Sequence, residues 1–256
     1  MARPSKKKPY EGHEIRYKWL QKEGILSWGG SKKNKRHTTL HTGNDIKIFL
    51  KDVLSQDWSP KDGRVIELGC GTGPILRWVC KRGFSGVGID VSKTAIAMAK
   101  EQSKGLDIKF RQGDVCNLNT KSLGKFDLVI DGLCLHCIID GRDRKAYFDN
   151  IFEILNSGGL FVLLTMCGPV DREKFHQECP DFKLYKNIIY TPLEKKIVYE
   201  GTRKFGSRDY MANRFVGHWK NILSEVRKAG FELKLIRYHA NNFKDAFGTL
   251  TVGALK

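Results

Sequence analysis

The sequence contains no long uncharged apolar run, so no segment of it is expected to span a membrane. The lysine-rich start lacks the hydrophobic stretch that a secretory signal requires, which predicts a cytoplasmic protein. Seven cysteines, an odd number scattered along the chain, favour reduced thiols over a disulfide framework. Acidic residues are outnumbered by lysine and arginine, 28 against 45, and the resulting formal net charge of +17 raises the question of a polyanionic partner.

The chain also lacks the ligand pattern of a structural metal site. Cys134-Leu135-His136-Cys137 is a C-x-x-C pair, but no second such pair and no paired histidines stand elsewhere. A structural zinc ion needs four ligands, so no metal is predicted. The surroundings also differ from those of a thioredoxin-like redox pair. We interpret Cys134 and Cys137 as small packing residues.

Apolar runs alternating with amphipathic stretches dominate the 256 residues that are present. Helices are expected after residue 73, from about 142 to a stop at the Ser-Gly-Gly of 157–159, and from 219 to Gly230. Strands that alternate with helices indicate an α/β protein with one mostly parallel sheet covered on both faces. The predicted strands lie at 65–68, 86–90, 108–111, 126–131, 160–166, 232–238 and 249–255.

A glycine-rich turn follows the first predicted strand. Gly69, Gly71 and Gly73 have the spacing G-x-G-x-G, whereas the dinucleotide fingerprint is G-x-G-x-x-G. Glycine permits close backbone approach, and Pro74 suits the first turn of the helix that comes next. The pattern predicts a nucleotide-like ligand on this turn, the alternative being a turn of purely structural use.

The run from Glu67 to Gly73 resembles motif I of the class I S-adenosylmethionine-dependent methyltransferases. The resemblance is dense from about residue 57 to 164, and it implies a Rossmann-like sheet of seven strands whose last strand is antiparallel. It also implies S-adenosyl-L-methionine as the cofactor. Asp90 ends the second strand where nucleotide-binding βαβ units place a ribose-binding carboxylate, although an aspartate there can also cap the next helix.

Further cofactor contacts follow from the same resemblance. Asp114 corresponds to the carboxylate that takes the adenine amino group, and the backbone of Val115 to the group that meets the ring. The predicted cofactor-binding residues are Glu67, Gly69, Cys70, Gly71, Gly73, Asp90, Val91, Asp114, Val115 and Asp131.

His136 is the best-placed candidate for a catalytic base. It follows the fourth strand, where family members present residues to cofactor and substrate, and an imidazole has a pKa suited to proton transfer near neutral pH. The alternative is that His136 only packs beside the cofactor. The predicted reaction is methyl transfer to an oxygen or nitrogen of a small molecule.

The first 42 residues form a basic, aromatic extension that could act as a lid. They hold eleven Lys or Arg against three Glu, with tyrosine and tryptophan interleaved. Such a segment can bind RNA, but charge runs are more often solvated surface. The exit of the fourth strand also lacks the N-P-P-Y-like or D-P-P-Y-like signature of adenine amino methylation. RNA or protein methylation, and a non-catalytic module that keeps the fold for partner binding, therefore remain as alternatives.

The remaining methyltransferase domain, 43–256, contains an insertion at about 168–217. Eight Phe or Tyr side chains populate it, and its charge is only ten basic against seven acidic residues. The β-prone runs 188–190 and 196–199 suggest a hairpin. We expect a substrate cover whose aromatics form apolar walls; a dimer contact or a packing flap is the alternative.

Overall fold

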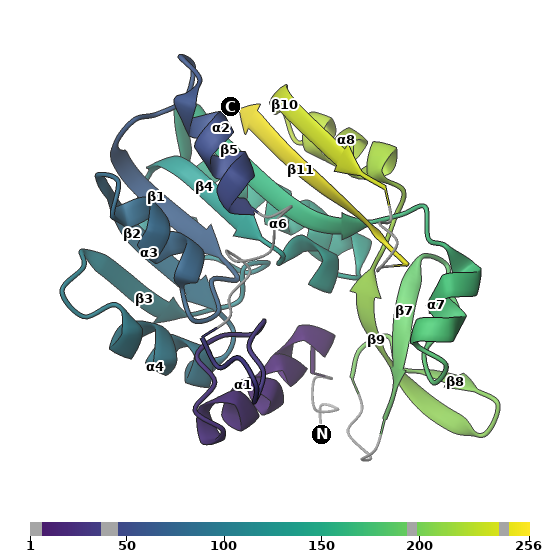
Figure 1. Ribbon diagram of the computed structural model, residues 1–256. Helices are drawn as coiled ribbons and strands as arrows, with labels where there is room; N and C mark the ends of the chain where they lie inside the picture. Colours follow the sequence, from purple (N-terminus) through teal and green to yellow (C-terminus); the bar gives the residue numbers. More distant parts are fainter. Residues whose placement is uncertain (1–6, 37–45, 194–198, 241–245) are drawn as a thin grey trace, which may run out of the picture.

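Seven strands of the computed structural model form one twisted sheet in the order β10-β11-β5-β4-β1-β2-β3 (Figure 1). The structure describes residues 7–36, 46–193, 199–240 and 246–256. The strands are β1 (Gly63–Leu68), β2 (Phe84–Asp90), β3 (Ile108–Gln112), β4 (Phe126–Gly132), β5 (Leu155–Cys167), β10 (Glu232–His239) and β11 (Gly248–Leu255).

Strands β1 to β5 pair in parallel, whereas β11 is antiparallel to both β5 and β10. The predicted Rossmann-like sheet with an antiparallel last strand is therefore confirmed. The carboxyl ends of β1, β2 and β4 lie in register, since Leu68 pairs with Ile89 and with Asp131. The loops that follow these strands consequently meet at one edge of the sheet, where open α/β sheets bind ligands.

Helices cover both faces of the sheet, as the alternating pattern predicts. Residues of α6 and α8 share one apolar core with the inner strands, and residues of α2, α3 and α4 share the core on the other face. The helices are α2 (Ile46–Ser55), α3 (Pro74–Cys80), α4 (Lys93–Gln102), α5 (Thr120–Leu123), α6 (Gly141–Ile154) and α8 (Trp219–Lys228). None of the helices in the described ranges is long and apolar enough to cross a bilayer.

One predicted boundary is wrong. The Ser-Gly-Gly run at 157–159 does not separate α6 from β5, because β5 already begins at Leu155, directly after the helix. Its pairing with β4 shifts register between Phe126 and Leu128, and Gly158 has a φ of 72°. The glycines thus lie at an irregularity inside the strand. Glycine adopts the positive φ found there readily because it has no side chain.

The insertion forms a second, antiparallel sheet in the order β6-β7-β9-β8, preceded by α7 (Arg172–Glu178). Its strands are β6 (Lys183–Tyr185), β7 (Ile188–Pro192), β8 (Arg203–Phe205) and β9 (Arg208–Phe215). The predicted hairpin is not what the structure contains: β7 pairs with β6 and β9, and most of the run 196–199 lies outside the described residues. A one-sided β pattern does not specify its partner strand.

The N-terminal segment, η1 (Pro9–Gly12) and α1 (His13–Lys22), crosses between the two sheets (Figure 1). Both oxygens of the Glu14 carboxylate accept hydrogen bonds at the start of α4, from the hydroxyls of Ser92 and Thr94 and from the Thr94 N–H. At the other end, Lys7 bridges to Tyr199 beside the insertion. The segment is therefore attached to the main sheet and to the insertion at once.

Candidate functional site

A cavity of about 440 Å³ opens at the carboxyl edge of the main sheet. Its volume falls within the range of roughly 300–1,000 Å³ that is usual for small-ligand sites. Loops after β1, β2, β3 and β4 form it together with the N-terminal segment, the end of β9 and the start of β11. We call the side lined by Glu67, Gly69–Thr72, Asp90, Val91 and Gly113–Val115 the acidic half, and the side lined by His13, His136, Met166, Arg214 and Phe247 the basic half.

The glycine turn has the backbone that its sequence predicts. Gly69, Gly71 and Gly73 have φ values of 68°, 52° and 72°, in the left-handed region that only glycine adopts easily. A Cβ on Gly71 would lie 2.4 Å from the hydroxyl oxygen of Tyr17, and one on Gly69 would lie 2.6 Å from the Cys134 sulfur. The turn therefore needs glycine both for its conformation and for the residues packed on it.

Two buried carboxylates organise the acidic half. The Asp90 oxygens accept hydrogen bonds of 2.8 Å from Gly71 N and 2.8 Å from Ser92 N, and Glu67 Oε2 accepts one of 3.0 Å from Leu76 N. Burial raises the pKa of Asp90 to about 6, although the two N–H donors lower it. Burial also raises the pKa of Glu67 well above its ordinary value. Each carboxylate keeps lone pairs free for a ligand, because it has about four acceptor positions.

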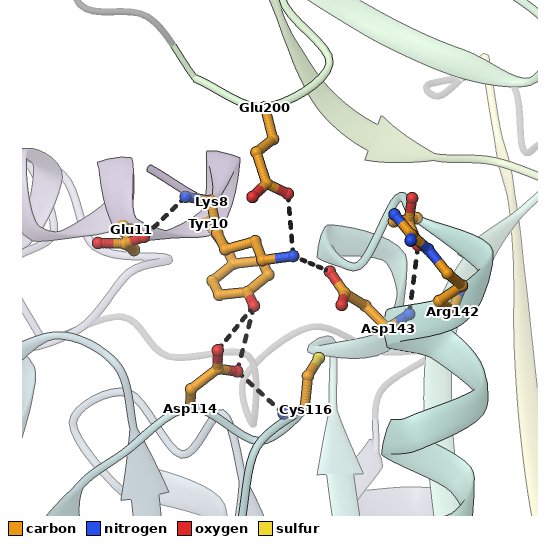
Figure 2. Close-up of polar contacts among 9 residues, drawn as sticks. Lys8, Tyr10, Glu11, Asp114, Cys116, Arg142, Asp143 and Glu200 are labelled. Carbon is orange, nitrogen blue, oxygen red and sulfur yellow. Dashed lines mark hydrogen bonds and ion pairs between the residues drawn. The ribbon is translucent and has the colours of Figure 1, made fainter. Parts of the chain in front are cut away.

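The N-terminal segment reaches Asp114, the third carboxylate of the acidic half. Figure 2 shows the Tyr10 hydroxyl directed at this carboxylate, 3.1 and 3.0 Å from its two oxygens. Cys116 N donates to the same group at 2.9 Å. Asp114 is thus already partnered by the N-terminal segment, which also lines the cavity, and the sequence did not predict this contact.

The same segment supplies an aromatic wall. Trp28 lies against His13 and Tyr17, with ring centroids 4.9 and 5.3 Å apart, and all three line the cavity with Tyr10. Lys8, just before η1, forms ion pairs of 2.6 Å with Asp143 of α6 and 2.9 Å with Glu200 of the insertion (Figure 2). The charge of Lys8 is therefore neutralised within the protein, whereas Lys6 lies outside the described residues.

Asp131 holds the loop after β4. Its carboxylate is fully buried and accepts hydrogen bonds from Cys134 N, Leu135 N and the Tyr147 hydroxyl. Burial raises its pKa to about 6, although these three donors lower it. Asp131 is not among the residues that line the cavity, so its side chain supports the wall from behind.

Arg144 of α6 fixes the other side of this loop. Its Nη1 donates to Leu135 O at 3.0 Å and to Ile138 O at 3.1 Å. The guanidinium is 3% exposed and forms a 2.5 Å ion pair with Glu225 of α8. It also lies over the Phe215 ring at 4.4 Å from its centroid. The residues around His136, which form the short helix η3 (Leu135–Cys137), are therefore held from both ends.

His136 is 5% exposed, and its Nδ1 is buried without a hydrogen-bond partner among the described residues. Burial, followed by the charge of Arg214 and the neighbouring His13, lowers its pKa well below the ordinary range. Burial and Arg214 likewise lower the pKa of His13 to about 3. Both imidazoles are consequently neutral at neutral pH. A neutral imidazole that lines a cavity can take up a proton from a ligand.

Nine of the eleven predicted site residues line this one cavity. Gly73 is the N-cap that precedes α3, and Asp131 supports the cavity wall from behind. The prediction that aromatics of the insertion form the walls is wrong for the described residues. Six of the eight, for example Tyr190 and Tyr210, pack into apolar clusters at the small sheet, and none of the eight lines the cavity. Arg214 is the residue that the described part of the insertion contributes to it. The residues that sequence reasoning missed in this role are His13, Met166, Arg214 and Phe247–Thr249.

Comparison with known proteins finds methyltransferases among the similar sequences. The family described as "Methyltransferase domain" matches residues 65–159. The Ubiquinone biosynthesis O-methyltransferase of Pelagibacter ubique is 26% identical over 141 residues, 52% of this chain and 58% of the relative. The human EEF1A lysine methyltransferase 2 is 31% identical over 138 residues, 50% of this chain and 58% of the relative. The chain thus spans less than two thirds of the length of these relatives.

A solved structure agrees on the fold. The S-adenosylmethionine-dependent methyltransferase of Methanosarcina mazei superposes with a TM-score of 0.59 at 18% identity, covering 78% of this chain and 95% of the other. The superposition supports the same fold, but an identity of 18% carries no information about the reaction. The reaction has to be argued from the residues of the site.

Proposed function

We propose that the chain is a class I S-adenosylmethionine-dependent methyltransferase and that it transfers a methyl group from S-adenosyl-L-methionine to an oxygen or nitrogen of a small-molecule acceptor. The observation that carries the proposal is a single cavity whose acidic half holds the motif residues and whose basic half holds His136. Such an arrangement lets donor and acceptor be held in one enclosed site, which is the main source of acceleration in a direct transfer.

The acidic half suits this cofactor. Glu67, Asp90 and Asp114 present carboxylate oxygens to a molecule that carries a sulfonium, an ammonium, ribose hydroxyls and an adenine amino group besides one carboxylate of its own. Thr72 also lines the cavity, and its hydroxyl is buried without a partner in the described part of the chain.

His136 is proposed as the base. When bound, S-adenosylmethionine supplies an electrophilic methyl group. The neutral His136 imidazole can accept the proton that a hydroxyl or amine acceptor loses as its bond to carbon forms. The low pKa keeps the imidazole unprotonated at neutral pH, at the cost of making it a weaker base. The hydrogen bonds of Arg144 and Asp131 to the loop fix its position.

The extension over residues 1–42 is proposed as a lid, and the insertion at about 168–217 as a cover for the acceptor. Tyr10, His13, Tyr17 and Trp28 line the cavity from the first, and Arg214 lines it from the second. A concave, partly apolar cavity of this size favours a small acceptor over a polymer. The two named relatives act on a ubiquinone precursor and a protein lysine according to their names, so kinship alone leaves the acceptor class open.

Transfer of labelled methyl groups tests the proposal. The protein and methyl-deuterated S-adenosylmethionine are incubated in three separate reactions, which contain the small-molecule, RNA or protein fraction of a cell extract. We expect the label in a small molecule. Label in RNA or protein would show that the acceptor is a polymer and not a small molecule. Binding of S-adenosylhomocysteine without any transfer would favour the non-catalytic module.

A further inference from the structure

Arg214 brings a positive charge into the basic half, and the described part of the chain offers it no carboxylate. It lies near the end of β9 and is the one lysine or arginine among the described residues that line the cavity. The ion pairs of the described residues, such as Lys8–Asp143 and Arg144–Glu225, do not include it. A charged group that lines a cavity without an opposite charge is a recognition site by default.

Only one nitrogen of the Arg214 guanidinium is occupied. Nη1 lies 3.2 Å from His13 Nε2 and 2.9 Å from the main-chain oxygen of Asn213, and it also donates to the Asn213 side chain. Because a guanidinium only donates, the His13 nitrogen is the acceptor in this contact. Nε and Nη2 have no partner in the described ranges. These two nitrogens form the edge that grips a carboxylate with two parallel hydrogen bonds.

Resting on the proposed function, we propose that the methyl acceptor carries a carboxylate and that Arg214 binds it beside His136. The site contains one positive charge, because His13 and His136 are both held neutral by burial and by Arg214 itself. One guanidinium matches one carboxylate. A phosphate monoester would leave a second negative charge in the same cavity as Glu67, Asp90 and Asp114, where it would be repelled.

The remaining walls fit the rest of such an acceptor. Met166 and Phe247 offer apolar surface in the cavity that Arg214 lines, and the His136 imidazole offers a polar group. An acceptor with a carboxylate at one end, an apolar body and a hydroxyl or amine toward His136 would satisfy each of these groups.

Titration with benzoate and its neutral isostere benzamide tests the assignment. The protein is saturated with S-adenosylhomocysteine, and the NMR signal of the Arg214 Nε–H is identified by its loss in Arg214→Gln. We expect benzoate to shift this signal saturably and benzamide to leave it in place. Arg214→Gln should weaken benzoate binding about 10- to 100-fold, the effect of losing a charged hydrogen-bond pair. Arg208→Gln is the matched control, since Arg208 is exposed on the same strand.

Every other outcome overturns the proposal. No saturable shift, equal binding of benzamide, or unchanged benzoate binding by Arg214→Gln would leave Arg214 a structural contact of His13. Tighter binding of phenyl phosphate would assign the site to phosphate. If Arg214→Gln instead weakens S-adenosylhomocysteine and spares benzoate, the carboxylate is the cofactor's own. Failure of the wild-type protein to bind S-adenosylhomocysteine would refute the proposed function. Titration of the protein alone with benzoate would still test whether Arg214 binds a carboxylate.

Discussion

The acidic and basic halves of the cavity are built in opposite ways. The acidic half comes from three loops that each follow a strand of the parallel sheet, within the stretch from Glu67 to Val115. The basic half gathers α1, η3, the end of β5, β9 and the start of β11, which are separated by up to the whole length of the chain. One half is a property of local sequence and the other a property of tertiary packing.

The two halves also differ in charge. Three carboxylates line the first, whereas one guanidinium and two neutral imidazoles line the second. A ligand that is cationic at one end and an acceptor that is anionic at the other would each find the complementary side. Variants that damage one half and spare the other should therefore separate cofactor binding from turnover.

The largest expected effect belongs to Arg144→Ala, which removes the support behind the basic half. The change breaks a pair in which the arginine is 3% and Glu225 34% exposed, and frees the Leu135 and Ile138 carbonyls. We expect the free energy of unfolding to fall by about 3 kcal/mol, measured by urea denaturation.

Arg142→Ala is the control for that variant. Its side chain is 94% exposed on the same helix, so the change should cost at most about 0.5 kcal/mol. In Arg144→Ala protein that is still folded, turnover should drop further than affinity for S-adenosylhomocysteine. An equal loss of both would contradict the separation of the halves.

Asp90→Ala should damage the acidic half instead. Affinity for S-adenosylhomocysteine should fall by about 1.5–3 kcal/mol in calorimetric titration, because charge-assisted hydrogen bonds are lost. Some stability should also be lost, since Gly71 N and Ser92 N each lose an acceptor, and Asp90→Asn should restore part of it. Asp107→Ala, at an exposed position before β3, removes the same charge as a control. Unchanged affinity would remove Asp90 from the cofactor site.

The sequence predicted the acidic half of the cavity and missed most of the basic half. The G-x-G-x-G spacing and the acidic residues at strand ends indicated the acidic half, because each signal is contained within a few consecutive residues. Arg214 carries no such signal: its neighbours in sequence are strand residues, and it reaches His13 only after the insertion and α1 have packed. The aromatic-rich insertion was misjudged for the same reason, since composition cannot tell a wall of the site from a core of its own.

Acid should weaken the basic half through His13. Its pKa is lowered to about 3 from 6.5, so the unfolded chain takes up a proton below pH 6.5 while the folded protein does not, and stability falls as the pH falls. Between about pH 7.5 and about pH 5, wild type should lose about 1–2 kcal/mol more than His13→Gln, because Asp90 and Asp131 titrate alike in both. Urea denaturation at the two pH values measures this; an identical loss in both proteins would mean that His13 is not buried as a neutral group. His176→Gln, at an exposed position, is the control substitution.

Lys8→Ala is expected to have the smallest effect, and it tests whether the N-terminal segment holds the two halves closed. Lys8 is 28% exposed and joins α6 to the insertion through Asp143 and Glu200. Burial alone would lower its pKa, but the two carboxylates outweigh this and raise it above the ordinary value, so the charge persists over the working pH range.

Loss of these partly exposed pairs should cost about 0.5–1 kcal/mol. If the segment must open for the cofactor to leave, S-adenosylhomocysteine should dissociate about 2- to 5-fold faster, as stopped-flow displacement would measure. Lys18→Ala removes a more exposed ion pair from the same segment, with Glu14, and should leave the rate unchanged. Equal dissociation rates in Lys8→Ala and wild type would show that the ion pairs of Lys8 with Asp143 and Glu200 do not control access to the cavity.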